Sequence, residues 1–184
     1  MKKILAISGS LRKKSYNTSI LRYIKQKFQD QLAIEIYTLE KLPLFNEDFE
    51  KPELPAAVIE FKNKFANADA LLIAAPEYNH SFTGVLKNAI DWASRKYDQP
   101  NSILFAKQIA IFGASPGGWG TKYSQEALLK VLEFLQMLIF HEEKLEIADV
   151  YMKIDDQGTI QDEKLKEQID FFCEKFMKTV SGIR

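Results

Sequence analysis

Short apolar runs alternate with helical patterns along most of the chain. The runs predict β-strands, four of them compact and the fifth weaker: Lys3–Ser8, Ala33–Leu39, Ala70–Ala75, Gln108–Gly113 and Met137–Ile147. Apolar residues at helical spacing mark the segments between and after them: Ile20, Leu21, Ile24, Phe28; Leu54, Val58, Phe61, Phe65; Val85, Leu86, Ala89, Ala93; Leu128, Val131, Leu132, Leu135; and Leu165, Ile169, Phe172, Phe176, Val180.

This alternation is typical of a parallel sheet with helices on both faces. The run at Ala70–Ala75 is apolar at every position, as expected for a strand that is buried on both sides. Right-handed crossovers then give a doubly wound sheet, and five strands favour the order 2-1-3-4-5. We therefore predict one α/β domain over residues 1–184.

Composition narrows the function. Lys plus Arg and Asp plus Glu both number 25, so the net charge is zero, which argues against a dedicated nucleic-acid binder. The one cysteine, Cys173, lies on an apolar helical stripe and predicts a buried thiol in a reducing compartment. The first apolar run is too short for a secretory signal, and no run approaches the length of a membrane span. We expect a cytoplasmic protein without membrane contact.

Unusual loops follow the first, third and fourth predicted strands. They read GSLRKKSYN (residues 9–17), PEYNHS (76–81) and ASPGGWG (114–120). In an open parallel sheet, ligands bind beyond the carboxyl ends of the strands, at the point where the strand order reverses. The three loops therefore converge on one predicted site.

The first loop is suited to an anion. It leads into a helix, whose unpaired N–H groups favour a phosphate. Ser10, Ser15, Asn17 and Thr18 can add hydrogen bonds, and Arg12 can add charge-assisted ones. The loop has neither the dinucleotide nor the P-loop glycine pattern, so a single terminal phosphate fits better. The alternative is that Ser15 or Asn17 only caps the helix.

In the second loop, Pro76 ends the strand and Tyr78 offers an aromatic surface. Backbone amides around Asn79 can meet the polar edge of a flat ring. A plain surface loop is the alternative. His80 could serve as an acid or base, but no partner arrangement for it is visible in the sequence.

The third loop has glycines at 117, 118 and 120, which permit close approach of the backbone to a ligand. Its exposed amides can stabilise negative charge on a bound ring. A flexible turn is the alternative.

With all three loops considered, the sequence resembles the NAD(P)H-dependent FMN reductase family, which has the flavodoxin-like fold and includes quinone, chromate and azo-dye reductases. The matching segments are GSLRKKSYN, PEYNHSFTGVLKNAIDWASR and the weaker ASPGGWG, and the match spans roughly residues 3 to 150.

The resemblance implies a set of FMN-binding residues and no catalytic side chain or metal. The phosphate would be held by Ser10, Arg12, Ser15, Asn17 and Thr18; the isoalloxazine ring would be lined by Pro76, Glu77, Tyr78 and Asn79, and met on its other side by Ser115, Gly117 and Gly118. NADPH or NADH would pass hydride to flavin N5, and a quinone, chromate, azo compound or similar small acceptor would then be reduced.

Two positions depart from the family pattern. Thr83 stands where the family usually has proline, and we expect this to loosen the start of the following helix. Lys122-Tyr123 stands where some relatives carry an arginine that packs dimers into tetramers. The resemblance therefore implies a homodimer, with the helix around Leu86–Arg95 as a candidate contact surface, and leaves a tetramer open.

Other functions on this strand order remain to be compared. A flavodoxin-type electron carrier would share the fold and FMN without oxidising a nicotinamide, and a nucleotide-handling transferase or hydrolase would lack the flavin. A response-regulator receiver needs an acidic cluster after the first strand, where this chain has Ser8-Gly9. Fold analogy alone does not separate them.

Overall fold

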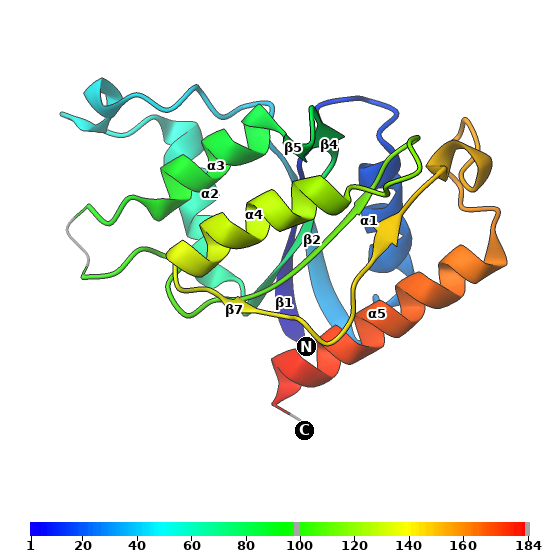
Figure 1. Ribbon diagram of the computed structural model, residues 1–184. Coiled ribbons are helices and arrows are strands. Elements are labelled where there is room, and N and C mark those ends of the chain that lie inside the picture. The colour runs from blue at the N-terminus through cyan, green and yellow to red at the C-terminus, as the bar shows by residue number, and fades with distance from the viewer. Residues whose placement is uncertain (98–99, 183–184) are drawn as a thin grey trace.

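The computed structural model describes residues 1–97 and 100–182, and Figure 1 shows the elements in chain order. These are β1 (Lys2–Ser8), α1 (Tyr16–Lys27), β2 (Leu32–Thr38), the 3-10 helix η1 (Glu47–Glu50), α2 (Ala56–Asn67), β3 (Ala70–Ala74), β4 (Glu77–Tyr78), β5 (Ser81–Phe82), α3 (Gly84–Ser94), β6 (Gln108–Ala114), α4 (Lys122–Phe134), β7 (Leu138–Ile139), β8 (Glu146–Ile147), the 3-10 helix η2 (Val150–Met152) and α5 (Glu163–Ser181). None of the helices among these residues is long and apolar enough to cross a bilayer.

The main sheet is parallel and confirms the predicted fold class. Its strands lie in the order β2-β1-β3-β6-β7, and β8 pairs with β6 beyond β7. With β7 and β8 taken as one interrupted strand, this is the expected 2-1-3-4-5 order. The order reverses between β1 and β3, whose carboxyl ends lie side by side.

The prediction of one continuous fifth strand was wrong. Ile109 of β6 is paired with Ile139 of β7, 30 positions later in the sequence, whereas Gly113 of β6 is paired with Glu146 of β8, 33 positions later. Three extra residues therefore bulge out between β7 and β8. The segment His-Glu-Glu-Lys (141–144) accounts for the break. A regular strand would turn some of these polar side chains onto a covered face of the sheet.

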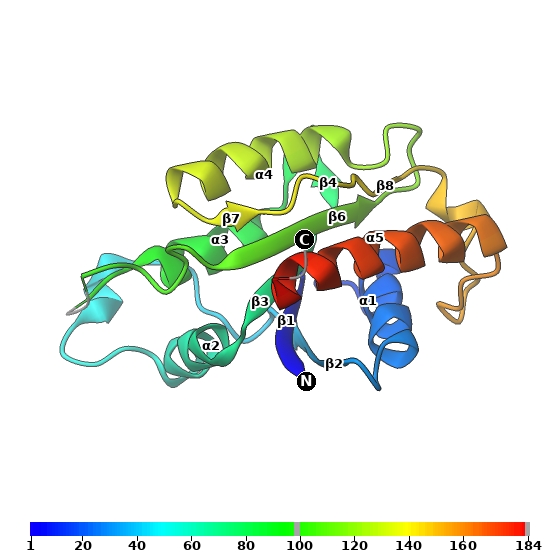
Figure 2. The ribbon, with the colours of Figure 1, turned by 90° about the horizontal axis from the view of Figure 1, so that it is seen from below.

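Two apolar layers sandwich the sheet because side chains alternate along each strand. Ile4 and Ala6 pack with α1 and α5 in one buried cluster, whereas Leu5 and Ile7 pack with α2, α3 and α4 in the other. Figure 2 shows the two groups of helices on opposite sides of the strands. Cys173 belongs to the first cluster, as predicted, and burial raises the pKa of its thiol.

The long connection between β2 and α2 is attached to α3. The Asn88 amide and the Trp92 indole N–H donate to the carbonyl oxygen of Pro43 at 2.9 and 2.8 Å. The Arg95 guanidinium donates to the Glu50 carboxylate at 2.5 and 2.9 Å, and this bond lowers the pKa of that carboxyl. The connection is therefore an ordered cover on the C-terminal half of α3.

The two helices of the other layer share a polar contact. Tyr23 of α1 donates its hydroxyl to Asp170 of α5 at 2.9 Å, and Lys27 lies 3.0 Å from the same carboxylate. Burial, followed by the hydrogen bond to Asp170, raises the pKa of Tyr23. The protonated phenol is therefore favoured in the folded state.

Replacing Tyr23 by phenylalanine tests this contact. Tyr23→Phe should lower the free energy of unfolding by about 1 kcal/mol at pH 7, because the Asp170 carboxylate loses a donor. The raised pKa means that unfolding releases a proton above pH about 10. The difference between wild type and variant should therefore shrink as the pH rises above that value. Urea unfolding at pH 7 and pH 10.5 measures both effects, with Tyr151→Phe, at an exposed tyrosine, as the control. A pH-independent difference would refute the assignment.

Candidate functional site

The loops that follow β1, β3 and β6 meet at the carboxyl edge of the sheet (Figure 1). Gly9 donates its N–H to the carbonyl of Ala74, at the end of β3, at 2.9 Å. Thr83, at the start of α3, donates its hydroxyl to the carbonyl of Gly9 at 2.7 Å. A Cβ on Gly9 would lie 2.8 Å from the ring of Pro76, so the first two loops pack too closely for a side chain there.

The loop after β1 gathers hydroxyl groups at the start of α1. Ser15 is the N-cap, and its hydroxyl accepts from the N–H of Thr18 at 3.3 Å. The Thr18 hydroxyl lies 2.7 Å from that of Ser8, and the Ser10 hydroxyl accepts from the N–H of Arg12 at 3.3 Å. The four hydroxyl-bearing residues are buried, while Arg12 is exposed. Hydroxyls and helix N–H groups are thus concentrated at one helix end.

The side chain of Asn17 points away from this group of hydroxyls, toward the end of β6. Its side-chain amide is hydrogen-bonded to the backbone of Ala114, the last residue of β6: Nδ2 donates to the carbonyl at 2.8 Å, and Oδ1 accepts from the N–H at 2.9 Å. The side chain is buried. Asn17 therefore joins the start of α1 to the end of β6.

The loop after β3 is a short β-hairpin, which the sequence did not reveal. β4 and β5 pair antiparallel, and the two residues between them, Asn79 and His80, have φ of 52° and 57°. Positive φ at both central residues is the geometry of a type I′ turn. Tyr78 is 53% exposed on this hairpin, and Pro76 is buried at its base.

The Glu77 carboxylate caps α4. That helix begins after Thr121, which has a left-handed φ of 72° and makes no side-chain capping bond. Glu77 accepts from the N–H of Ser124 at 3.0 Å and so takes the capping role. The Ser124 hydroxyl donates to the carbonyl of Pro76 at 2.8 Å. Sequence reasoning missed Ser124, because nothing in its local sequence indicates a partner 48 residues away.

The glycines of the third loop have different roles. A Cβ on Gly120, whose φ is +57°, would lie 2.7 Å from the backbone of Glu146, so this glycine is needed for packing. At Gly118 no atom lies within 4 Å of a Cβ, and at Gly117 the nearest is 3.8 Å away. Neither residue has a positive φ, unlike Gly120. The fold of this chain does not itself require glycine at 117 and 118.

Comparison with known proteins identifies the family. The profile of the NADPH-dependent FMN reductase family matches residues 2–149. The chain is 42% identical to an NAD(P)H-dependent FMN reductase of Pseudomonas aeruginosa over 91% of its own length and 89% of that protein. It belongs to the NADPH-dependent FMN reductase family.

Two further relatives support this. A 2-hydroxy-1,4-benzoquinone reductase of a Burkholderia species is 34% identical, over 99% of this chain and 98% of that protein. The solved structure of FerB, a flavoenzyme NAD(P)H:(acceptor) oxidoreductase from Paracoccus denitrificans, superposes with a TM-score of 0.90 at 28% identity and covers 99% of this chain and 98% of that one.

Thr83, which departs from the pattern of the FMN reductase family, does not loosen the start of α3 as expected. Its hydroxyl accepts from the N–H of Leu86 at 3.4 Å and so caps the helix, while also donating to Gly9. The side chain is buried. The reason is that a hydroxyl can accept and donate at once, so threonine here connects the helix to the first loop.

Aromatic side chains cluster between the hairpin and the start of α4 in this member of the FMN reductase family. His80 stacks on Tyr123 of α4, with ring centroids 4.4 Å apart and planes at 13°. Trp119 is 62% exposed, and its ring lies 5.9 Å from that of Tyr123. Tyr123 lies outside the three loop motifs and so adds an aromatic ring from α4 to the site.

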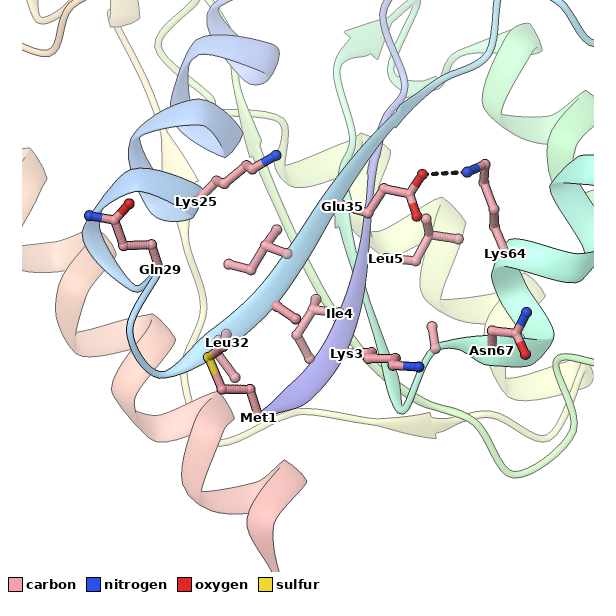
Figure 3. A pocket seen from close by; sticks show the side chains of 13 residues that line it. Met1, Lys3, Ile4, Leu5, Lys25, Gln29, Leu32, Glu35, Lys64 and Asn67 are labelled. Atoms are coloured by element: carbon pink, nitrogen blue, oxygen red, sulfur yellow. Dashed lines mark hydrogen bonds and ion pairs between the residues drawn. The ribbon is translucent and has the colours of Figure 1, made fainter.

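A separate groove of about 590 Å³ follows the edge strand β2 (Figure 3). Lys25 of α1 and Gln29, in the turn after that helix, line one side. Lys64 and Asn67 of α2 line the other, and Lys64 forms an ion pair with Glu35 of β2. Its lining comes from β1, β2, α1 and α2, together with the adjoining residues Met1, Gln29 and Ala68, rather than from the three loops. In residues 1–97 and 100–182, no three His, Cys, Asp or Glu side chains are grouped to hold a metal ion.

Alanine substitutions at two glycines distinguish a glycine that the fold requires from one that leaves room for a ligand. Gly118→Ala should change the unfolding free energy of the flavin-free protein by less than about 0.5 kcal/mol, because its Cβ meets nothing. It should nevertheless weaken FMN binding. Gly113→Ala should destabilise by about 1–3 kcal/mol or more, since its Cβ would lie 2.1 Å from the Thr121 hydroxyl oxygen. Urea unfolding and FMN titration measure the two effects. Equal destabilisation by both variants, or unchanged FMN affinity in Gly118→Ala, would contradict this assignment.

Proposed function

We propose that this protein is an FMN-containing oxidoreductase that takes hydride from NADPH or NADH and reduces a quinone or a similar small acceptor. The observation that carries the proposal is the pairing of two features at one edge of the sheet. Hydroxyls and helix N–H groups gather at the start of α1, and a backbone segment with unexplained glycines begins at the end of β6. The names of the relatives support the same reaction class.

The start of α1 fits a single phosphate. The first-turn N–H groups of Tyr16 and Asn17 have no acceptor within the helix. Ser15, the N-cap, directly precedes them, and Ser10 lies earlier in the same loop. In the part of the chain that the structure describes, no carboxylate forms an ion pair with Arg12, whose guanidinium lies 5.9 Å from the Tyr16 ring centre. Arg12 is therefore available for a charge-assisted bond to the phosphate.

The ring end of the site fits a flat aromatic group. Gly117 and Gly118 leave room for close approach of the backbone, and the hairpin turn presents Tyr78 and the amides around Asn79. Pro76 and Glu77 hold this hairpin against α4, which makes them supports of the site. Ser115 stands at the start of the glycine segment, with its hydroxyl donating to the Gly117 carbonyl at 3.2 Å.

When bound, FMN supplies the ring that accepts hydride and passes electrons on. The protein's part is to bind, orient and shield. His80 stacks on Tyr123, and within residues 1–97 and 100–182 it forms no hydrogen bond of the kind by which a base activates a nucleophile. The exposed rings of Tyr78 and Trp119 offer flat apolar surface to a planar nicotinamide or quinone.

We extend the proposal to assembly and location. A homodimer through the region of α3 is consistent with the exposed apolar side chains on the connection that covers this helix: Leu44 is 80% and Phe49 46% exposed. A single buried cysteine fits a reducing compartment such as the cytoplasm.

The cofactor and the turnover test the proposal. Purified protein should be yellow and should release FMN, because the first loop suits one phosphate and lacks a pyrophosphate pattern. Mass spectrometry of the released cofactor identifies it. The loaded protein should oxidise NADPH or NADH with a quinone, chromate or an azo dye as acceptor. FAD as the sole cofactor would refute the phosphate argument, and flavin-loaded protein that oxidises neither nicotinamide would favour an electron carrier.

The role of His80 is tested separately. His80→Ala should change the rate of flavin reduction by far less than the roughly 100-fold expected for loss of a general acid or base. An altered KM for the quinone is compatible, since the stacked ring shapes the surface near the hairpin. Stopped-flow bleaching of the flavin isolates the reductive step, and His141→Ala, at the other histidine of the chain, is the matched control. A hundredfold loss with FMN fully bound would make His80 catalytic.

A further inference from the structure

Asn17 supplies a hydrogen-bonding partner where the sheet leaves a gap. Gly113 and Ser115 donate their N–H groups to Leu145 and Ile147, on the β8 side of β6, at 3.2 and 3.0 Å. Backbone groups alternate sides along a strand, so the N–H and C=O of Ala114 face the opposite side, toward β3.

On that side there is no strand to receive them. β3 ends at Ala74, and the last ladder bond runs from the N–H of Ala75 to the carbonyl of Phe112 at 2.7 Å. After Ala75 the chain passes through Pro76 into the hairpin of β4 and β5, so β3 does not continue alongside Ala114. An unpaired backbone N–H and C=O at this buried position would be costly. The Asn17 amide takes the place of the missing strand, at 2.8 and 2.9 Å.

This pairing fixes the start of the glycine segment. Ser115 follows Ala114 directly and is held on the other side by Ile147 and by the N–H of Val150, which donates to the Ser115 carbonyl at 3.2 Å. The segment is thus held from both sides at its base, and one of the two holds comes from the first turn of α1. Asn17 is 4% exposed, and its carbonyl oxygen and one amide hydrogen are used in the pair.

Resting on the flavin site proposed above, we propose that Asn17 is a positioning residue. Its side chain sets the glycine segment, at the ring end of the site, against the start of α1, at the phosphate end, and its amide does not serve to bind phosphate. Its backbone N–H stays available to the phosphate in any variant.

Riboflavin, which lacks the phosphate, separates the two roles. In Asn17→Ala the dissociation constants of FMN and riboflavin should rise by the same factor, roughly tenfold for the loss of two buried hydrogen bonds. In Arg12→Ala, the matched control, the constant for FMN should rise roughly tenfold or more while that for riboflavin stays unchanged. Quenching of flavin fluorescence on titration of flavin-free protein gives all four values.

Two further readouts distinguish positioning from a general loss of stability. At saturating FMN, the visible absorption spectrum of Asn17→Ala should shift, because the backbone beside the ring is displaced. Tyr23→Phe lies on the same helix, away from the site, and should leave both flavin affinities and the spectrum unchanged despite its lower stability. Should Asn17→Ala fail to fold, Asn17→Asp keeps the acceptor for the Ala114 N–H and should still raise the riboflavin constant.

The outcomes are distinct. A loss of FMN affinity with riboflavin affinity intact would make Asn17 a phosphate ligand and overturn the proposal. Unchanged affinity of Asn17→Ala for both flavins would overturn it as well. So would an unchanged riboflavin dissociation constant in Asn17→Asp. Wild-type protein that binds neither flavin would instead refute the proposed function.

Discussion

The hydrogen-bonded pair between the Asn17 amide and the backbone of Ala114 is the interaction on which the arrangement of the site depends. It spans 97 residues of sequence and joins the first turn of α1 to the end of β6. A parallel sheet brings strand ends to a common edge but leaves backbone groups unpaired where one strand stops before its neighbour. A side-chain amide has one donor face and one acceptor, so it can replace a strand partner at such a place.

The other loops are fixed by the same kind of bond, in which a side chain satisfies a backbone group at the end of an element. Thr83 caps α3 and holds Gly9, and Glu77 caps α4 from the hairpin after β3. In return, the hydroxyl of Ser124 on α4 donates to the carbonyl of Pro76. These bonds reach between loops or from a helix to a loop, and so they connect the loops of the site to one another and to the helices. The polar residues that look like ligands in the sequence are in part its scaffold.

The sequence predicted the fold class because uniformly apolar runs and helical stripes depend on burial alone. It also predicted that the three loops meet at one edge of the sheet, because the carboxyl ends of parallel strands lie together. It did not predict the break in the last strand, where His141 and its charged neighbours interrupt the ladder, nor the hairpin at Asn79-His80. The sequence also did not predict where each polar side chain of the loops would point. Asn17 and Glu77 could be placed at the edge, but their partners Ala114 and Ser124 lie far away in the chain.

A crystal structure of the FMN-loaded protein tests the central claim most directly. We predict that the phosphate lies within hydrogen-bonding distance of the first-turn N–H groups of α1 and of Arg12, and that the Asn17 amide is still paired with Ala114. The ring should then lie between the hairpin at Tyr78 and the segment at Gly117–Gly118. A phosphate bound by the Asn17 side chain, with the Ala114 pair broken, would contradict the account.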